Sequence, residues 1–361
     1  MSLHRGKSRA VLSLTEIVDA GIHTVEYVVK QILEDVDDDP VAMLDKVRIG
    51  DREKKALVID KDAEDSFRRE LHKYHRNKFS SITVYGEERL DDKNLDLTDE
   101  PGIFALVDMV DGTDLLERGL SNWCSAAVFF CPMAEPGRKI LAAFVGLPSK
   151  EIYYASADDE TVYVKPFGSR AAVPVKRPSK VKQLKNASVC FYGQKCEGLQ
   201  SITSHRMLEY VIRLNNQQKD KRKNKKSKGE SPSRDDEDVE FRIYTLAGIP
   251  MVVKLIDHKV RTAKNIDVVF DVRGQNPHDV VPGAFLAKKA GATVMNLVTG
   301  EPLTMEDLES ALLRPAAEDS KLKYVIAATS ELCDELLPLI SPIAQRIDDT
   351  RKLPDTLFPI S

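Results

Sequence analysis

Two aspartates three residues apart follow an apolar run, an arrangement suited to holding a metal ion. The run covers residues 103–107, and Asp108, Asp111 and the pair Gly112-Thr113 come directly after it. The run has the composition of a β-strand, and Gly112 can adopt the backbone angles that turn the chain away from that strand. Asp108 and Asp111 would then project near one another as oxygen ligands. Because the same pattern also occurs in ordinary turns, its meaning depends on the other acidic positions.

Three further acidic residues could complete such a site. Glu87 follows a short strand-like segment at 81–84, one strand before Asp108. Asp279 begins a helical segment, and Asp60 precedes apolar residues at helical spacing. Taken alone, an aspartate at a helix start is commonly just an N-cap.

The order of these motifs resembles that of the inositol monophosphatase family, which comprises magnesium-dependent and often lithium-sensitive phosphatases, together with bisphosphate nucleotidases and some sugar bisphosphatases. The four matching motifs are Asp60, Gly86-Glu87-Glu88, the segment 108–113, and His278-Asp279 followed by a helix. The resemblance extends from the Asp60 helix to beyond Gly300. It implies an α/β fold with an α+β half and an α/β half, arranged as a layered αβαβα sandwich with the metal site in the cleft between the halves.

The resemblance also implies a role for each acidic residue. Glu87, Asp108 and the carbonyl of Val110 would hold a first Mg²⁺ ion, which activates a water molecule. Asp108, Asp111 and Asp279 would hold a second ion near the leaving oxygen, and a weaker third ion would bind at Glu87. Such cations are needed because a phosphate monoester is anionic and repels an attacking hydroxide.

The residues that follow Asp111 would bind the phosphate. Free backbone N–H groups at Gly112 and Thr113, where a helical turn is expected to open, favour an anion. In the resembled family a threonine hydroxyl and an upstream aspartate take a proton from the water, which assigns catalytic roles to Thr113 and Asp60 beside Glu87. Asp62 is the competing assignment for that aspartate.

The sequence departs from the family pattern at positions that concern the substrate. Met109 replaces a proline, and His278 replaces the tryptophan before the last aspartate. Asp271 is the nearest match to an acidic residue that contacts a substrate hydroxyl, while Arg273 and His278 are candidates for binding a second anionic group. Either of these two residues could equally be a structural ion-pair or capping residue.

The predicted function is therefore Mg²⁺-dependent hydrolysis of a phosphate monoester of a small metabolite, such as an inositol phosphate, a sugar phosphate or a bisphosphate. One alternative is a 3′(2′),5′-bisphosphate nucleotidase, and another is a non-catalytic binding protein on the same fold. The four retained carboxylates argue against loss of catalysis. No Walker loop, G-x-S-x-G or H-E-x-x-H motif offers a rival chemistry.

Bulk properties limit the partners and the location. The chain has 361 residues and a net charge of −4, so it has no general attraction to nucleic acid or to an anionic membrane. Its apolar runs are too short to span a bilayer, and its first residues do not form a secretory signal, so we expect a cytoplasmic protein. Dimers are common in the resembled family, which makes a homodimer an expectation here.

Two halves are expected, at 1–185 and 186–361. The first would contain an amphipathic helix at 11–33, the helix behind Asp60 and a mainly antiparallel set of strands, and the second would alternate strands and helices. A charged segment at 215–238 interrupts the second half, with basic residues preceding acidic ones. Its polarity predicts a disordered, solvated loop, with a nucleic-acid-binding arm or a lid over the cleft as alternatives.

Overall fold

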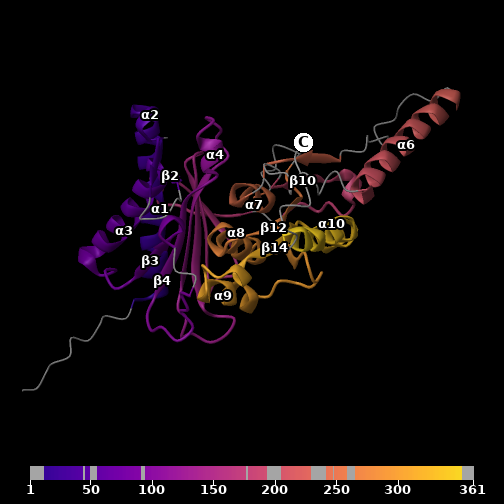
Figure 1. Ribbon diagram of the computed structural model, residues 1–361. Coiled ribbons are helices and arrows are strands. Elements are labelled where there is room, and N and C mark those ends of the chain that lie inside the picture. The colour runs from indigo at the N-terminus through magenta and orange to yellow at the C-terminus, as the bar shows by residue number, and fades with distance from the viewer. Residues whose placement is uncertain are drawn as a thin grey trace, which may run out of the picture.

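The computed structural model describes most of the chain, namely residues 12–43, 45–48, 55–90, 94–175, 178–192, 205–228, 241–246, 248–257 and 265–351. Five layers succeed one another across the molecule, alternating between helices and sheets (Figure 1). The predicted αβαβα sandwich is therefore confirmed. Among the described residues, no helix is long and apolar enough to cross a membrane.

Two long helices form the first layer. Helix α1, Leu14–Asp38, begins at a capping box in which Ser13 and Glu16 exchange hydrogen bonds, and its buried stripe includes Val25 and Val29. Helix α3, Val58–Asn77, packs beside it, and both cover one face of the first sheet. The sequence placed the first helix at 11–33, so the helix itself is confirmed but extends five residues further.

The first sheet has seven strands in the order β3-β4-β5-β6-β7-β8-β9. All neighbouring strands pair antiparallel except β3 and β4, which are parallel, as the prediction of a mainly antiparallel set requires. The central strands are buried on both faces because helices cover both. The bounds are Thr83–Gly86 for β3, Phe104–Asp111 for β4, Cys124–Phe130 for β5, Ile140–Leu147 for β6, Glu151–Ser156 for β7, Tyr163–Pro166 for β8 and Val173–Pro174 for β9.

The second sheet has five strands in the order β11-β10-β12-β14-β13. Helices α7, Ile249–Ile256, and α8, Pro277–Lys289, fill the layer between the two sheets and share one apolar core with both of them. The strand bounds are Ser188–Phe191 for β10, Arg242–Tyr244 for β11, Val268–Gln275 for β12, Thr293–Asn296 for β13 and Leu322–Ala327 for β14. The two sheets fall on either side of residue 185, but the division into two domains stays a prediction.

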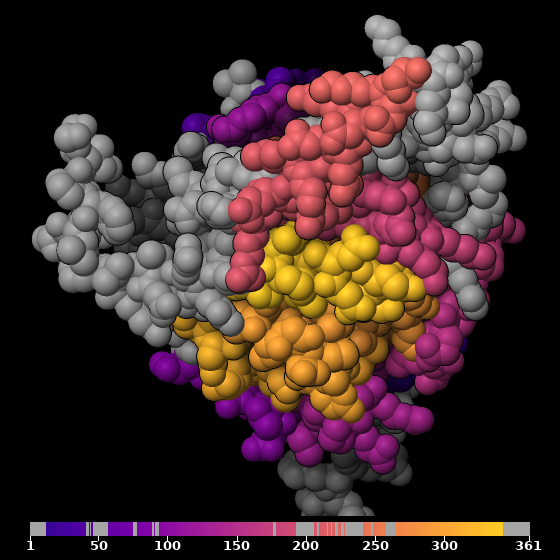
Figure 2. Space-filling model, turned by 90° about the vertical axis from the view of Figure 1, so that its right-hand side faces the viewer, coloured from indigo at the N-terminus to yellow at the C-terminus, as the bar shows by residue number. Residues whose placement is uncertain are grey.

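The outer layer consists of α10, Ser330–Arg351, and α6, His205–Lys228, which lies across it (Figure 2). The prediction of a disordered loop from residue 215 is wrong for 215–228, which belong to α6. Lysine, arginine and glutamine are good helix formers and the first glycine is Gly229, so the helix continues although it has little to pack against. Residues 229–238 lie outside the described residues.

Several elements had no counterpart in the sequence prediction. They include the antiparallel pair β1, Lys46–Arg48, and β2, Lys55–Leu57, the edge strand β9, and the helices α2, Pro40–Met43, and α9, Met305–Leu313. Helix α9 begins at a capping box formed by Thr304 and Asp307, a signal that was present in the sequence.

Candidate metal centre

A β-bulge brings the two aspartates of strand β4 together. The pairing of β4 with β5 runs regularly to Asp108 opposite Ala126 and resumes with Asp111 opposite Cys124, so three residues of β4 match two of β5. In a regular strand, side chains three residues apart point to opposite faces. The extra residue removes that alternation, and the two carboxylates interact. The Asp108 carboxylate also accepts a hydrogen bond from the N–H of Val110, at 3.0 Å.

Gly112 turns the chain at the end of β4. Its φ is 103°, and a Cβ at this position would lie 2.9 Å from the carbonyl oxygen of Asn122, so only glycine fits. The short helix α4, Thr113–Leu116, follows directly, as the sequence predicted. The Thr113 hydroxyl lies 3.0 Å from Asp60 Oδ1 and 2.8 Å from the Val110 carbonyl oxygen, and its single proton can be donated to only one of them at a time.

Asp60, rather than Asp62, is the aspartate that meets Thr113. It lies in the first turn of α3, where its other carboxylate oxygen accepts a hydrogen bond from the N–H of Leu57, at 3.1 Å. The pKa of Asp60 is raised to about 7, chiefly by burial and further by the charges of Glu88 and Glu87. The hydrogen bonds from Leu57 and Thr113 oppose this rise. Asp62 is exposed.

Glu87 begins the short 3₁₀ turn η1, Glu87–Arg89, immediately after β3. Beneath this turn lies Glu64 of α3, a buried carboxylate that accepts a hydrogen bond from the N–H of Glu88 at 2.8 Å. A Cβ on Gly86 would come within 2.1 Å of the Glu64 carboxylate, so the glycine of this motif makes room for Glu64. Sequence analysis missed Glu64, although it lies one helical turn after Asp60 and therefore on the same face of α3.

The remaining parts of the centre come from α7 and α8. Asp279 lies in the first turn of α8. The first N–H of α7, at Ile249, donates a hydrogen bond of 2.8 Å to Asp111 Oδ2. Gly248, with φ of 107°, allows this approach, because its Cβ would lie 3.1 Å from the same oxygen. Residues from α3, from the first sheet and from the layer between the two sheets therefore meet at one point.

The electrostatics of the centre favour a nearby positive charge or protonation of the carboxylates. Burial, followed by the charges of Glu87, Asp111 and Asp279, raises the pKa of Asp108 well above its usual range. Burial likewise raises the pKa of Asp111 to about 7, opposed by the hydrogen bond from Ile249 and increased by the charge of Glu87. The pKa of Asp279 is raised by burial and then by Glu87 and Asp111. Desolvated carboxylates that repel one another are stabilised by protonation or by a cation, and their hard oxygen atoms suit Mg²⁺.

His278 also reaches this centre. Its side chain is buried, with Nε2 at 3.3 Å from Asp279 Oδ1. One ligand atom each from Glu87, His278 and Asp279 lie within 4.8 Å of one another. From the sequence, His278 was a candidate for binding a second anionic group. In the structure it lies beside two candidate metal ligands.

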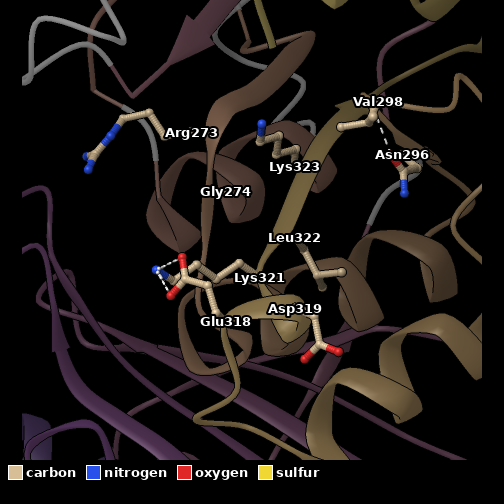
Figure 3. A pocket seen from close by; sticks show the side chains of 9 residues that line it. All are labelled: Arg273, Gly274, Asn296, Val298, Glu318, Asp319, Lys321, Leu322 and Lys323. Atoms are coloured by element: carbon tan, nitrogen blue, oxygen red, sulfur yellow. Dashed lines mark hydrogen bonds and ion pairs between the residues drawn. The ribbon is translucent and has the colours of Figure 1, made fainter. Parts of the chain in front are cut away.

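The two other residues predicted to bind the substrate are Asp271 and Arg273. Asp271 is 1% exposed, and its Oδ1 accepts hydrogen bonds from the N–H groups of Arg273 and Gly274, at 2.8 and 2.7 Å. It thus fixes the irregular end of β12, and burial raises its pKa. Arg273 lines a pocket of about 280 Å³ together with Lys321 and Lys323 (Figure 3). None of the candidate metal ligands lines that pocket.

Comparison with known proteins supports the fold. Neither protein-family models nor curated protein sequences match this chain. Among solved structures, an IMPase, or inositol monophosphatase, from Thermotoga maritima is 16% identical, covers 92% of this chain and 99% of its own, and has a TM-score of 0.58. A Ca²⁺-bound IMPase family protein from Staphylococcus aureus is 14% identical, with coverages of 91% and 96% and a TM-score of 0.56.

A third similar structure is an IMPase/NADP phosphatase complexed with NADP and Ca²⁺, which is 15% identical, with coverages of 91% and 97% and a TM-score of 0.57. The chain therefore has the fold of the inositol monophosphatase family, and the resemblance inferred from its motifs is confirmed at the level of the fold. At these identities the fold is what the comparison establishes; activity has to be argued from the site.

Proposed function

We propose that the protein is a Mg²⁺-dependent phosphatase that hydrolyses a phosphate monoester of a small metabolite. The observation that carries this proposal is the convergence of Asp108, Asp111, Glu87 and Asp279 beside a Thr113 hydroxyl that contacts Asp60. The similar structures support it, since they include phosphatases and proteins of this family bound to Ca²⁺, NADP or D-inositol-1-phosphate.

The residues of this chain that would hold the cations are Glu87, Asp108, Asp111, Asp279 and the carbonyl of Val110. Bound there, Mg²⁺ would neutralise the phosphate oxygens, lower the pKa of a water molecule and stabilise the leaving oxygen. Burial and neighbouring carboxylates raise the pKa values of Asp108, Asp111 and Asp279, and bound cations would supply the opposing positive charge.

Proton transfer would be the task of Thr113 and Asp60. Asp60 Oδ1 accepts the hydroxyl proton of Thr113, which orients the hydroxyl oxygen to accept a proton from a water molecule in turn. A carboxylate with a pKa near 7 is close to the operating pH, where a general base works best. The free N–H groups around Gly112 would hold the phosphate near this hydroxyl.

A second candidate substrate class is a nucleotide that carries an additional phosphate. The pocket beside Arg273 favours it, because Arg273, Lys321 and Lys323 could bind a second anionic group, although Lys321 already pairs with Glu318 at 2.9 Å. Arg273 and the candidate ligands Asp111 and Asp279 all influence the pKa of Tyr192, so the pocket and the centre lie within electrostatic reach of the same residue.

A phosphate-release screen with Mg²⁺ tests the proposal. It should include inositol phosphates, sugar phosphates, sugar bisphosphates, adenosine 3′,5′-bisphosphate and NADP, with Asp108→Asn as the inactive control. Hydrolysis of one class by the wild type, abolished in the variant and by EDTA, is the expected result. If no phosphoester is hydrolysed although the protein binds Mg²⁺, the chain is instead a binding protein on this fold.

A further inference from the structure

The metal centre contains one side chain that a purely oxygen-liganded site does not need. His278 is the second residue of helix α8 and is 2% exposed, so its imidazole is held inside the centre rather than in solvent. Pro277 occupies the first position of α8 and fixes where the helix begins. His278 and Asp279 therefore both lie in its first turn.

The spacing of the imidazole matches a coordination shell. Zinc bound tetrahedrally to nitrogen and oxygen at about 2.1 Å has neighbouring ligand atoms about 3.4 Å apart. His278 Nε2 and Asp279 Oδ1 are already 3.3 Å apart, and a Glu87 carboxylate oxygen lies within 4.8 Å of ligand atoms of both. A shift of the Glu87 carboxylate toward this pair would complete a three-ligand site, and Glu87 follows a strand end in a short turn.

A nitrogen donor changes which metal the site prefers. Mg²⁺ takes oxygen ligands, whereas imidazole suits zinc and other late first-row dications, whose affinity for such sites rises along the series to copper. Three protein ligands with a fourth position open to water are also the common arrangement of accessible zinc sites. Glu87 and Asp279 are partly exposed, so an ion can reach them.

We propose that Glu87, His278 and Asp279 form a mixed nitrogen–oxygen site that binds a borderline dication such as Zn²⁺ more tightly than Mg²⁺. Since Glu87 and Asp279 are also candidate Mg²⁺ ligands, Zn²⁺ at this site displaces Mg²⁺ and slows hydrolysis. The inference rests on the proposed function only for this last effect, because binding itself needs no substrate.

The test measures binding of Zn²⁺ alone and of Mg²⁺ alone to metal-stripped protein by calorimetry, in the wild type, His278→Phe and His278→Gln. The glutamine variant keeps a polar side chain of similar size in case phenylalanine is not tolerated. We expect Zn²⁺ affinity to fall by about tenfold or more in both variants, and Mg²⁺ affinity to change by less than about threefold. X-ray absorption at the zinc edge should show imidazole scattering in the wild type and not in the variants.

The matched control is His23→Gln. His23 Nε2 also lies 2.8 Å from a carboxylate, that of Glu70, but this pair is at the surface and no third ligand joins it among the described residues. The control should bind Zn²⁺ as the wild type does. Equal losses of Zn²⁺ and Mg²⁺ affinity at position 278, or a zinc spectrum without imidazole, would overturn the inference and make His278 a structural partner of Asp279.

The two proposals can fail separately. Zinc binding through His278 in a protein that hydrolyses no phosphoester would uphold this inference and refute the proposed phosphatase. Mg²⁺-dependent hydrolysis with Zn²⁺ binding unchanged in both variants would do the opposite.

Discussion

At the scale of single residues, the contact between Asp60 and Thr113 decides between two assignments that the sequence left open. Both Asp60 and Asp62 were candidates, being two positions apart in the same segment. In the structure only Asp60 contacts Thr113 and is buried, while Asp62 points to solvent. The helical pattern behind Asp60 already favoured that residue, but the contact itself depends on where α3 begins relative to β4.

Asp60→Asn should therefore lower turnover by about 10² to 10⁴-fold, the usual contribution of a general base, because asparagine cannot take a proton. Asp62→Asn is the matched control and should leave turnover within about twofold, as surface substitutions generally do. Steady-state kinetics on the best substrate of the screen checks both. Comparable losses in the two variants would remove Asp60 from its role as base.

Asp111→Asn tests the metal centre at the same scale. Asparagine keeps the shape of the side chain but removes a charge that the cation requires, so turnover should fall by about 100-fold or more. Mg²⁺ raises the melting temperature of any protein that binds it only when folded, and the variant should lose most of that increase. Thermal melts with and without Mg²⁺ are the measurement. A variant as active as the wild type at saturating Mg²⁺ would show that Asp111 is not a ligand.

At the scale of elements, the junction of β4 and α4 depends on one glycine. Gly112→Ala must place a methyl group against the Asn122 carbonyl oxygen in a backbone conformation that costs about 1–2 kcal/mol for any residue with a Cβ. Gly102→Ala is the matched control, because Gly102 also has a positive φ, 121°, but no atom lies within 4 Å of its would-be Cβ.

Urea unfolding should show a larger loss of stability for Gly112→Ala than for Gly102→Ala. The difference is the free-energy cost of the contact between the new methyl group and the Asn122 carbonyl oxygen. The Gly112 variant should also lose turnover, since Thr113 follows it directly. Equal losses of stability in the two variants would mean that backbone conformation alone explains the requirement for glycine.

Helix α6 is the element that the sequence misjudged. Its described side chains beyond Leu214 are exposed, and its one described hydrogen bond to α10 runs from Arg206 Nη1 to the Pro338 carbonyl oxygen, near its first turn. A helical segment without buried side chains, such as the described part of α6 beyond Leu214, contributes little to the core.

Deleting 219–238 should consequently leave turnover within a few-fold of the wild type and shift the melting temperature only slightly. The deletion should be compared with Arg206→Ala, which removes a contact that the deletion leaves intact. Loss of turnover on deletion, with the melting temperature retained, would indicate that the segment covers the centre as a lid. Salt-sensitive binding to RNA that disappears on deletion would indicate a nucleic-acid arm.

At the scale of the whole molecule, the clustered carboxylates link stability to pH and to metal. An unfolded aspartate titrates near pH 4, whereas Asp60 and Asp111 titrate near 7 in the folded protein. Between these values the native state binds more protons than the unfolded state, so the free energy of unfolding decreases as pH rises. Below about pH 4 both states are protonated and the effect vanishes.

Melting temperatures of the metal-free protein measured from pH 4 to 8 test this linkage. The advantage of Asp111→Asn over the wild type should grow as pH rises through this window and should shrink or reverse when Mg²⁺ is added. If the two proteins keep a constant difference across the window in EDTA, Asp111 does not titrate abnormally.

The sequence predicts interactions between residues that are close together in the chain better than interactions between distant segments. The two strands that lead to Glu87 and Asp108 and the order of the motifs are local patterns, and these strands were predicted within a few residues. The family resemblance paired Asp60 with Thr113, whereas the support of Asp111 by Ile249 and the room that Gly86 makes for Glu64 join distant segments, so no spacing reveals them. The place of His278 beside Glu87 is of the same kind.

The centre cannot exist until most of the chain has been synthesised, because Glu87 and Asp279 are separated by 192 positions in the sequence. At about 5–20 residues per second, a ribosome needs roughly 10–40 s to make that stretch. During this time Asp108 and Asp111 are already made, but neither the N–H of Ile249 nor the carboxylate of Asp279 exists to complete their surroundings. A cation that needs all of these residues can therefore be bound only after Asp279 has been made.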